Sequence, residues 1–254
     1  MLKPIGLQLY TLRDALTEDF TSVIKQIADM GYVAVEPYGG IPVTMQEAKT
    51  LFDDLGLQVP SAHLLLPIGD DQDELLETAS TLGISHYIIP WLPSEDFASV
   101  DSIKHVCERL NQANEVVKAQ GMTLGYHNHW WEFQTIDGQI AYDIMLENID
   151  PSIVLEIDTY WVQVAGQSIP NLLNKLGKRA PLLHLKDGPA DNNESPMVAV
   201  GEGVIDFKTI IQEYAENTDY LIVELDRCAT DMLTAVENSF TYLINEGLGH
   251  GRQS

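Results

Sequence analysis

Short apolar runs recur along the chain, and most of them end in an acidic residue or a histidine. The runs are short and lack helical periodicity, so each is predicted to form a buried strand. A strand is expected near residues 5–10, 32–36, 57–63, 86–90, 122–128, 153–158, 181–186 and 220–225.

Amphipathic segments separate these runs, such as the one with apolar residues at helical spacing between residues 20 and 28. Repeated strand–helix units favour a parallel sheet covered by helices. The expected fold is α/β, a single (β/α)8 TIM barrel that forms one domain over residues 1–254. An open doubly wound sheet is the competing fold. It is disfavoured because Tyr10-Thr11-Leu12-Arg13 follows the first run instead of a glycine-rich phosphate fingerprint. Helix-ending glycines in left-handed caps are expected at Gly31, Gly56, Gly83 and Gly121.

Composition narrows the expected partners. The formal net charge is −24, from 38 acids and 14 bases, so the chain should repel nucleic acid and anionic membranes. Two cysteines are too few for a disulfide framework, and no apolar run spans a bilayer. A cytoplasmic protein without a signal segment is expected. Barrels of this size often associate, but no segment marks an interface, so a homo-oligomer stays an open expectation.

The acids and histidines at the strand ends predict a metal site. In a parallel barrel the C-terminal ends of the strands meet at one mouth. Asp158, His184 and Glu224 are the strongest ligand candidates, since carboxylates and a neutral imidazole suit Mn²⁺, Mg²⁺, Co²⁺ or Zn²⁺. For any one of these acids the alternative is a solvated loop carboxylate or a helix N-cap.

The segment from Tyr126 to Phe133 is rich in polar and aromatic residues just after the fifth predicted strand. Glu132 is one candidate for the fourth metal ligand, and His127 is the other because it lies on the strand itself. His127 and His129 are also candidates for binding substrate, or for hydrogen-bonded residues of the pocket. The two adjacent tryptophans offer flat faces on which a sugar ring can stack.

Two further residues are candidates for binding substrate. Lys186 follows His184 by two residues and is expected to hold an oxyanion or phosphate, to polarise a carbonyl, or to pair with Glu156 or Asp187. Glu202 lies between two glycines that allow a tight turn toward the mouth. Alternatively, those glycines only position Asp206 as a helix N-cap.

At these residues the chain resembles the sugar phosphate isomerase/epimerase superfamily. These xylose isomerase-like barrels include ketose 3-epimerases, inosose dehydratases, hydroxypyruvate isomerases and type IV AP endonucleases. The resemblance covers essentially the whole chain and is most specific at residues 156–159, 184–188, 201–203 and 223–224. It implies a divalent metal held by Glu, Asp, His and Glu from successive strands, of which Asp158, His184 and Glu224 match the last three.

The chain departs from that pattern at two places. Where many members have Glu followed by Asn, this chain has His127-Asn128. Trp161 stands where ketose epimerases often have a histidine that contacts substrate, so it is the corresponding candidate substrate contact.

The resemblance implies a divalent-metal-dependent isomerase or epimerase of a small sugar, keto-sugar or sugar phosphate. Proton abstraction next to a carbonyl would give an enediolate, with Glu132 and Glu224 as the acid/base pair. Glu36 and His63 are expected to line the opposite side of the pocket and hold hydroxyls. The alternatives are a lyase that dehydrates an inosose or 3-keto-sugar and a barrel that binds a sugar without catalysis.

Overall fold

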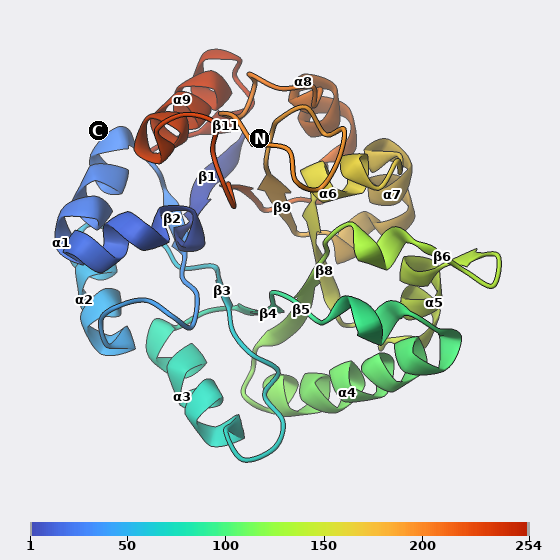
Figure 1. Cartoon of the computed structure of the whole chain (residues 1–254). Coiled ribbons are helices and arrows are strands. Elements are labelled where there is room, and N and C mark those ends of the chain that lie inside the picture. The colour runs from blue at the N-terminus through green and yellow to red at the C-terminus, as the bar shows by residue number, and fades with distance from the viewer. Residues whose placement is uncertain (1, 253–254) are drawn as a thin grey trace.

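A computed structural model describes residues 2–252 of the protein. Eight parallel strands form a nearly closed barrel, and the helices that connect them lie around its outside (Figure 1). The predicted barrel is therefore confirmed, and the open doubly wound sheet is not formed. The barrel strands are β1 (Lys3–Gln8), β2 (Ala34–Glu36), β3 (Ser61–His63), β4 (His86–Ile89), β5 (Thr123–His127), β8 (Val154–Asp158), β9 (Leu182–Leu185) and β10 (Tyr220–Val223).

The barrel is weakest between β2 and β3. Only isolated bridges join them, Ala34 with Gln58 and Tyr38 with His63. Proline at position 60 has no N–H to donate between these two bridges, which shortens the strand predicted over residues 57–63 to β3. On the other side of β2, regular parallel pairing with β1 continues through Glu36.

The helices pack their apolar faces on the outside of the barrel. Phe20, Ile24 and Ile27 of the first helix are buried, as their spacing predicts. Gly31, Gly56, Gly83 and Gly121 each follow the end of a helix with φ of 105°, 64°, 69° and 79°, which confirms all four of the expected left-handed glycines. The helices are α1 (Arg13–Met30), α2 (Met45–Asp54), α3 (Gln72–Leu82), α4 (Val100–Ala119), α5 (Ala141–Asn148), α6 (Thr159–Val164), α7 (Ile169–Leu176), α8 (Phe207–Thr209) and α9 (Met232–Asn245).

Three short strands were not predicted. β6 (Thr135–Ile136) and β7 (Gln139–Ile140) form an antiparallel hairpin. Its turn contains Asp137 and Gly138, both with positive φ, which is the usual chemistry of a tight hairpin. β11 (Gly249–His250) pairs with the start of β1. Across residues 2–252 no helix has the length and apolar character needed to cross a membrane.

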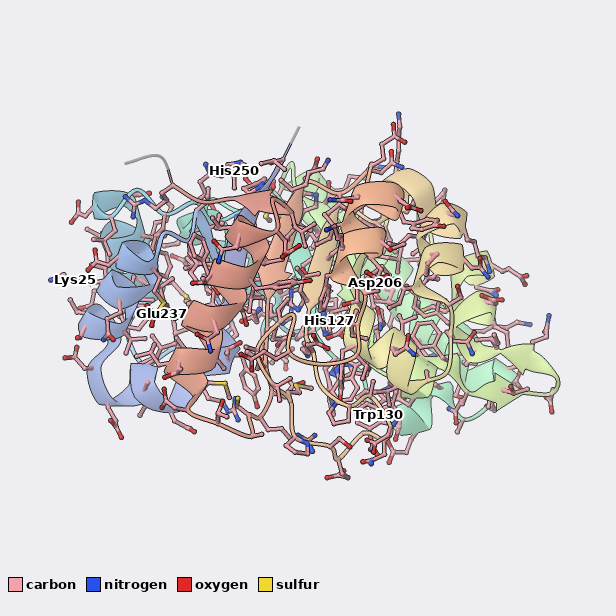
Figure 2. All side chains as sticks on the ribbon, turned by 90° about the horizontal axis from the view of Figure 1, so that it is seen from above. Lys25, His127, Trp130, Asp206, Glu237 and His250 are labelled. Carbon is pink, nitrogen blue, oxygen red and sulfur yellow. The ribbon has the colours of Figure 1, made fainter. Side chains whose placement is uncertain are left out.

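The interior of the barrel changes from apolar to polar toward its C-terminal end. Ile88, Leu182 and Ile222 pack together as an apolar layer. Gly125 of β5 leaves room for Ile88, whose Cδ1 a Cβ at this position would approach to 2.4 Å. His127 lies two residues after Gly125, and His184 lies two residues after Leu182. Both side chains therefore point into the barrel on the C-terminal side of the apolar layer. In Figure 2, His250 and Trp130 lie at opposite ends of the molecule with His127 between them.

Candidate active site

Imidazole, carboxylate and ammonium groups converge inside the C-terminal end of the barrel. They come from six strands or from the residues just beyond them, and all are buried. This confirms that the ends of the apolar runs meet at one mouth. The converging residues are Glu36, His63, His127, Glu156, Asp158, His184, Lys186 and Glu224.

Four of these residues form a group that fits a divalent cation. His127, Asp158, His184 and Glu224 each offer one donor atom, and these atoms lie within 4.8 Å of one another. His184 Nδ1 is 2.6 Å from Glu224 Oε2, and His127 Nε2 is 3.7 Å from Asp158 Oδ2. Within residues 2–252, Asp158 Oδ2 accepts no well-oriented hydrogen bond, although a lysine nitrogen lies 2.9 Å away. Two imidazoles and two carboxylates are a donor set that Zn²⁺, Mn²⁺ and related ions accept. We call these four residues the ligand group.

Glu132 lies outside the ligand group. Tyr126 Oη donates a hydrogen bond to Glu132 Oε1 at 2.6 Å, and the backbone N–H of His129 donates to Oε2 at 2.9 Å. Both oxygens are therefore used to hold the turn that follows β5. Of the two candidates for the fourth ligand, the structure brings His127 to the other three residues and leaves Glu132 behind the turn.

The carboxyl of Glu132 should make stability depend on pH. Burial raises its pKa to about 7, while hydrogen bonds from Tyr126 and His129 offset part of that effect. Because the folded-state pKa exceeds the unfolded one, the stabilising contribution is present at low pH and is lost as pH rises from about 4 to about 7. The shift from 4.5 to about 7 corresponds to about 3 kcal/mol.

We therefore expect Glu132→Gln to flatten the pH dependence of the free energy of unfolding by about 3 kcal/mol across this range. Urea unfolding in EDTA at a series of pH values measures this, with Glu147→Gln on the exposed face of α5 as the control. Equal slopes for Glu132→Gln and the unmodified protein would contradict the assignment.

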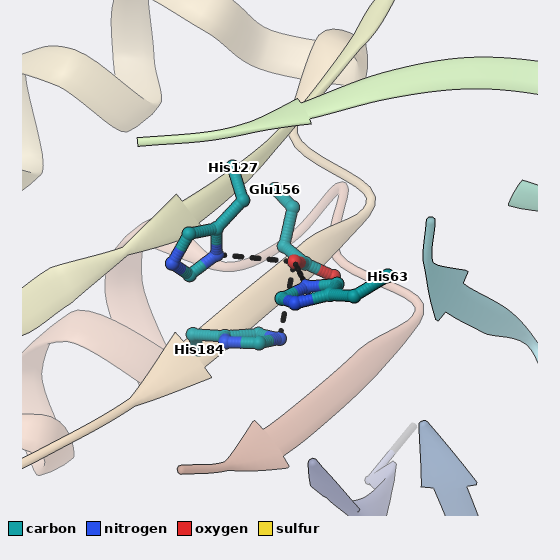
Figure 3. Close-up of side chains that lie close together, drawn as sticks. All are labelled: His63, His127, Glu156 and His184. Atoms are coloured by element: carbon teal, nitrogen blue, oxygen red, sulfur yellow. Dashed lines mark hydrogen bonds and ion pairs between the residues drawn. The ribbon is translucent and has the colours of Figure 1, made fainter. Parts of the chain in front are cut away.

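Glu156 contacts three histidines through one oxygen. Its Oε2 is 2.6 Å from His63 Nε2 and 3.1 Å from both His127 Nδ1 and His184 Nε2 (Figure 3). His127 and His184 use their opposite nitrogens in the ligand group. A neutral imidazole has one N–H, so donating it to Glu156 leaves the other nitrogen free to bind a cation. Sequence reasoning did not select Glu156, although its place two residues before Asp158 puts it on the same face of β8.

Replacing Glu156 with glutamine should therefore weaken cation binding without removing a residue of the ligand group. We expect the affinity for Zn²⁺ or Mn²⁺ to fall about 10–100-fold, because the tautomers of His127 and His184 are no longer held. Titration calorimetry measures the affinity, circular dichroism confirms folding, and Glu147→Gln again serves as control. An unchanged affinity would show that Glu156 does not orient these rings.

Glu36 is buried beneath this group. Gln8 Nε2 donates to Glu36 Oε2 at 2.8 Å, and His184 Nε2 lies 2.7 Å from the same oxygen. Burial opposes a charge on His184, but the carboxylates of Glu156, Glu224 and Glu36 outweigh it and raise its pKa well above the usual range. Glu36 is thus placed to orient His184 rather than at the surface of a pocket.

Lys186 is surrounded by carboxylates. Its Nζ lies 2.9 Å from Asp158 Oδ2, 2.8 Å from Glu224 Oε2 and 2.9 Å from Asp226 Oδ2. Burial would lower its pKa, but these three acids outweigh that effect and raise it well above the usual value. The expected pairing with Glu156 or Asp187 is therefore not the one formed.

Trp161 is the aromatic neighbour of this ammonium group. The Nζ of Lys186 lies 5.4 Å from the centre of the Trp161 ring, which is itself buried. The ring is thus placed for a cation–π interaction with Lys186, and it is not among the residues that line the pocket at the mouth.

The loop after β9 is organised around Asp187. Its Oδ2 accepts hydrogen bonds from the N–H groups of Gly201 and Gly203 at 2.9 and 3.0 Å. A Cβ at position 203 would overlap the carboxylate, which explains the glycine there. Glu202 between them is exposed and accepts a hydrogen bond from Asn238 on α9, so the structure places it away from the mouth. The alternative is confirmed for Asp206, which caps α8 through a bond from Thr209 N at 3.1 Å.

A pocket of about 530 Å³ opens at the mouth of the barrel. Its polar lining is a set of side chains from the ends of three strands, β3, β5 and β10, and from the turn after β5: His63, His127, His129, Glu224 and Asp226. The ligand group thus borders the pocket through His127 and Glu224. Asp226 and the residues of the apolar side of the pocket were not selected from the sequence, although all of them except Leu75 of α3 lie within a few residues of a strand end.

Fold and site together define a TIM barrel with a buried His/Asp/Glu cluster at the C-terminal end of its strands. The chain belongs to the xylose isomerase-like TIM barrel family, whose family model matches residues 24–239. Among curated proteins it is similar to an inosose dehydratase of Clostridium beijerinckii, with 28% identity over 280 aligned positions that cover 94% of this chain and 91% of that protein.

Solved structures agree with this assignment. A sugar phosphate isomerase/epimerase from Parabacteroides distasonis superimposes with a TM-score of 0.82 and 25% identity, covering 96% of each chain. The IOLI protein, crystallised with a bound zinc atom, has a TM-score of 0.75 and 14% identity over 96% of this chain and 97% of its own. The second likeness shows the fold alone.

Proposed function

We propose that the protein is a divalent-metal-dependent enzyme that removes a proton from the carbon next to a carbonyl of a small keto-sugar or keto-polyol. One observation carries the proposal: the four residues of the ligand group, from β5, β8, β9 and the end of β10, meet at the floor of a pocket. The similarity to an inosose dehydratase and the zinc in the IOLI protein support it.

His127, Asp158, His184 and Glu224 would hold the ion. When bound, the ion would supply Lewis acidity toward a carbonyl and an adjacent hydroxyl. Glu156 and Glu36 would keep the two histidines in the required tautomers, while Lys186 offsets the charge of the carboxylates around it.

Glu224 is the group we assign to proton removal. All of its contacts with residues 2–252 use Oε2, which leaves Oε1 of this pocket-lining side chain to a substrate. Glu132 is less suited to share that role, because both of its oxygens accept hydrogen bonds within the fold. His63 lines the same pocket from β3 and is our candidate for donating a proton to the substrate.

The enediolate formed on the substrate has two outcomes. Return of a proton gives an isomer or epimer. Alternatively, the C–O bond at the β-carbon breaks, the leaving hydroxyl takes up a proton from the protein, and water departs to give a dehydrated product. The isomerase or epimerase outcome needs only the groups already named. The dehydratase outcome is the second candidate, and the inosose dehydratase that aligns with 94% of this chain favours it.

Proton exchange tests the proposal. The metal-loaded protein is incubated in deuterated water with an inosose and a panel of ketoses, and NMR follows exchange of the C–H next to the carbonyl. We expect metal-dependent exchange with at least one compound, and the product, an epimer or an enone, tells the outcomes apart. Ligand-induced stabilisation without exchange or elimination by any compound would favour a barrel that only binds a sugar.

A further inference from the structure

We infer that the substrate is uncharged, carries no phosphate, and bears an apolar substituent next to its keto-sugar part. The inference rests on the proposed function and concerns the half of the pocket that the chemistry does not use. That half is lined by apolar side chains from the segments just after β1, β3 and β4 and by one residue of α3. We call it the apolar wall: Tyr10, Leu64, Leu65, Leu75, Pro90 and Trp91.

The apolar wall exposes large side chains next to the polar floor. Leu65 is 69% exposed, Trp91 53% and Tyr10 39%, which makes them half of the six large apolar residues exposed in residues 2–252. Leu64 and Leu65 directly follow His63 on β3, so the wall and the polar floor belong to one continuous pocket. An apolar patch of this kind beside polar groups is typical of a ligand site. A compact polyol alone would leave these side chains in water.

Groups that bind anions are missing from the pocket. Within residues 2–252, its lining includes two carboxylates, Glu224 and Asp226, and neither lysine nor arginine. Arg13 lies beside it, but its Nη1 and Nη2 donate to the carbonyl oxygens of Tyr10 and Asp226, each at 2.9 Å. Lys186 is already paired with three carboxylates. A phosphate here would meet the carboxylates of Glu224 and Asp226 without a lysine or arginine side chain that is free to pair with it.

The backbone donors of the loop after β9 are also occupied. β9 is the seventh strand of the barrel, and TIM barrels often bind phosphate with the loops after strands seven and eight. Here Asp187 accepts hydrogen bonds from the N–H groups of Gly188, Gly201, Gly203 and Ile205. An internal carboxylate thus takes the position that a phosphate would need.

The test compares three forms of one keto-glucose: its methyl glycoside, its phenyl glycoside and its phosphate monoester. Titration calorimetry with metal-loaded protein gives the affinity of each. We expect the phenyl glycoside to bind about tenfold or more tightly than the methyl glycoside, because its ring packs on the apolar wall. The phosphate monoester should bind more weakly than the methyl glycoside.

Trp91→Ala and Leu65→Ala should reduce the phenyl preference to nearly none while the bound metal stays unchanged, since both side chains are exposed and neither belongs to the ligand group. Equal affinities for the two glycosides, absence of binding by all three compounds, or tighter binding of the phosphate ester would overturn the inference. So would a Trp91→Ala variant that changes only the oligomeric state, since a second copy would then cover the wall. If the protein binds the phenyl glycoside preferentially but catalyses no proton exchange, the proposed function would be overturned while the inference about the apolar substituent would stand.

Discussion

Replacing Glu224 with glutamine is expected to lower the rate of substrate C–H exchange by about 10²–10⁴-fold, the usual contribution of a general base. The amide cannot accept the proton, and it also weakens the contacts that Glu224 Oε2 makes with His184 and Lys186, at 2.6 and 2.8 Å. Cation affinity should fall as well. Measuring exchange by NMR at saturating metal keeps the ion bound, so that any remaining loss of rate reports the missing base alone.

The control for this variant is Glu108→Gln. Glu108 lies on α4 with its side chain 77% exposed, so its replacement should leave exchange unchanged. A Glu224→Gln variant that retains full exchange with metal bound would assign proton removal to another group, with His63, His129 and Asp226 as the remaining pocket-lining candidates outside the ligand group.

Replacing Lys186 with methionine is expected to cost about 3–5 kcal/mol in the free energy of unfolding of the metal-free protein. Lys186 Nζ lies within 2.9 Å of Asp158, Glu224 and Asp226, and methionine would leave these acids without a cation in the barrel interior. Added Mn²⁺ or Zn²⁺ should recover part of the loss, because the ion binds two of the same carboxylates. Urea unfolding with and without EDTA measures both effects.

Lys175→Met is the matched control. Lys175 also pairs with a carboxylate, Asp143, at 2.7 Å, but the pair is about half exposed on the surface. Surface pairs contribute about 0–1 kcal/mol, so this variant should change stability little. Similar losses for both variants would mean that the carboxylates around Lys186 are as well solvated as those on the surface.

The barrel could be predicted from the sequence because two local signals agree. Apolar runs too short for helices alternate with helical periodicity, and residues such as Gly31 and Gly83 mark where each helix ends. The interrupted pairing between β2 and β3 was not predicted, although Pro60 gave a reason for it. The hairpin of β6 and β7 was also missed, despite the Asp137-Gly138 turn.

From the sequence, only those site residues could be predicted that lie on a strand or at its end, because alternation along the strand tells which of them face the interior of the barrel. Position at a strand end identified Asp158, His184 and Glu224 and left His127 as one of two candidates for the fourth ligand. The structure brings these four residues together. It did not indicate that Tyr126 would hold Glu132 away from them, because that depends on how the turn after β5 folds back.

Contacts between segments that are far apart in the sequence could not be predicted. Glu156 meets His63 from a strand 93 positions away. Asp187 binds the loop whose glycines were expected either to turn Glu202 toward the mouth or to position Asp206 as a helix N-cap. The apolar wall brings together the residues that follow three different strands, Tyr10, Leu65 and Trp91 among them. These residues become neighbours only because the folded barrel brings the ends of its strands together.

The central claim is that the ligand group binds a divalent cation. Elemental analysis of the purified protein, after dialysis against Mg²⁺, Mn²⁺, Co²⁺ and Zn²⁺, tests it most directly, with Asp158→Asn as the comparison. We predict close to one ion per chain in the unmodified protein and little in the variant, because Asp158 is one of the four ligands. An absence of metal from both proteins, or equal amounts in both, would contradict the account.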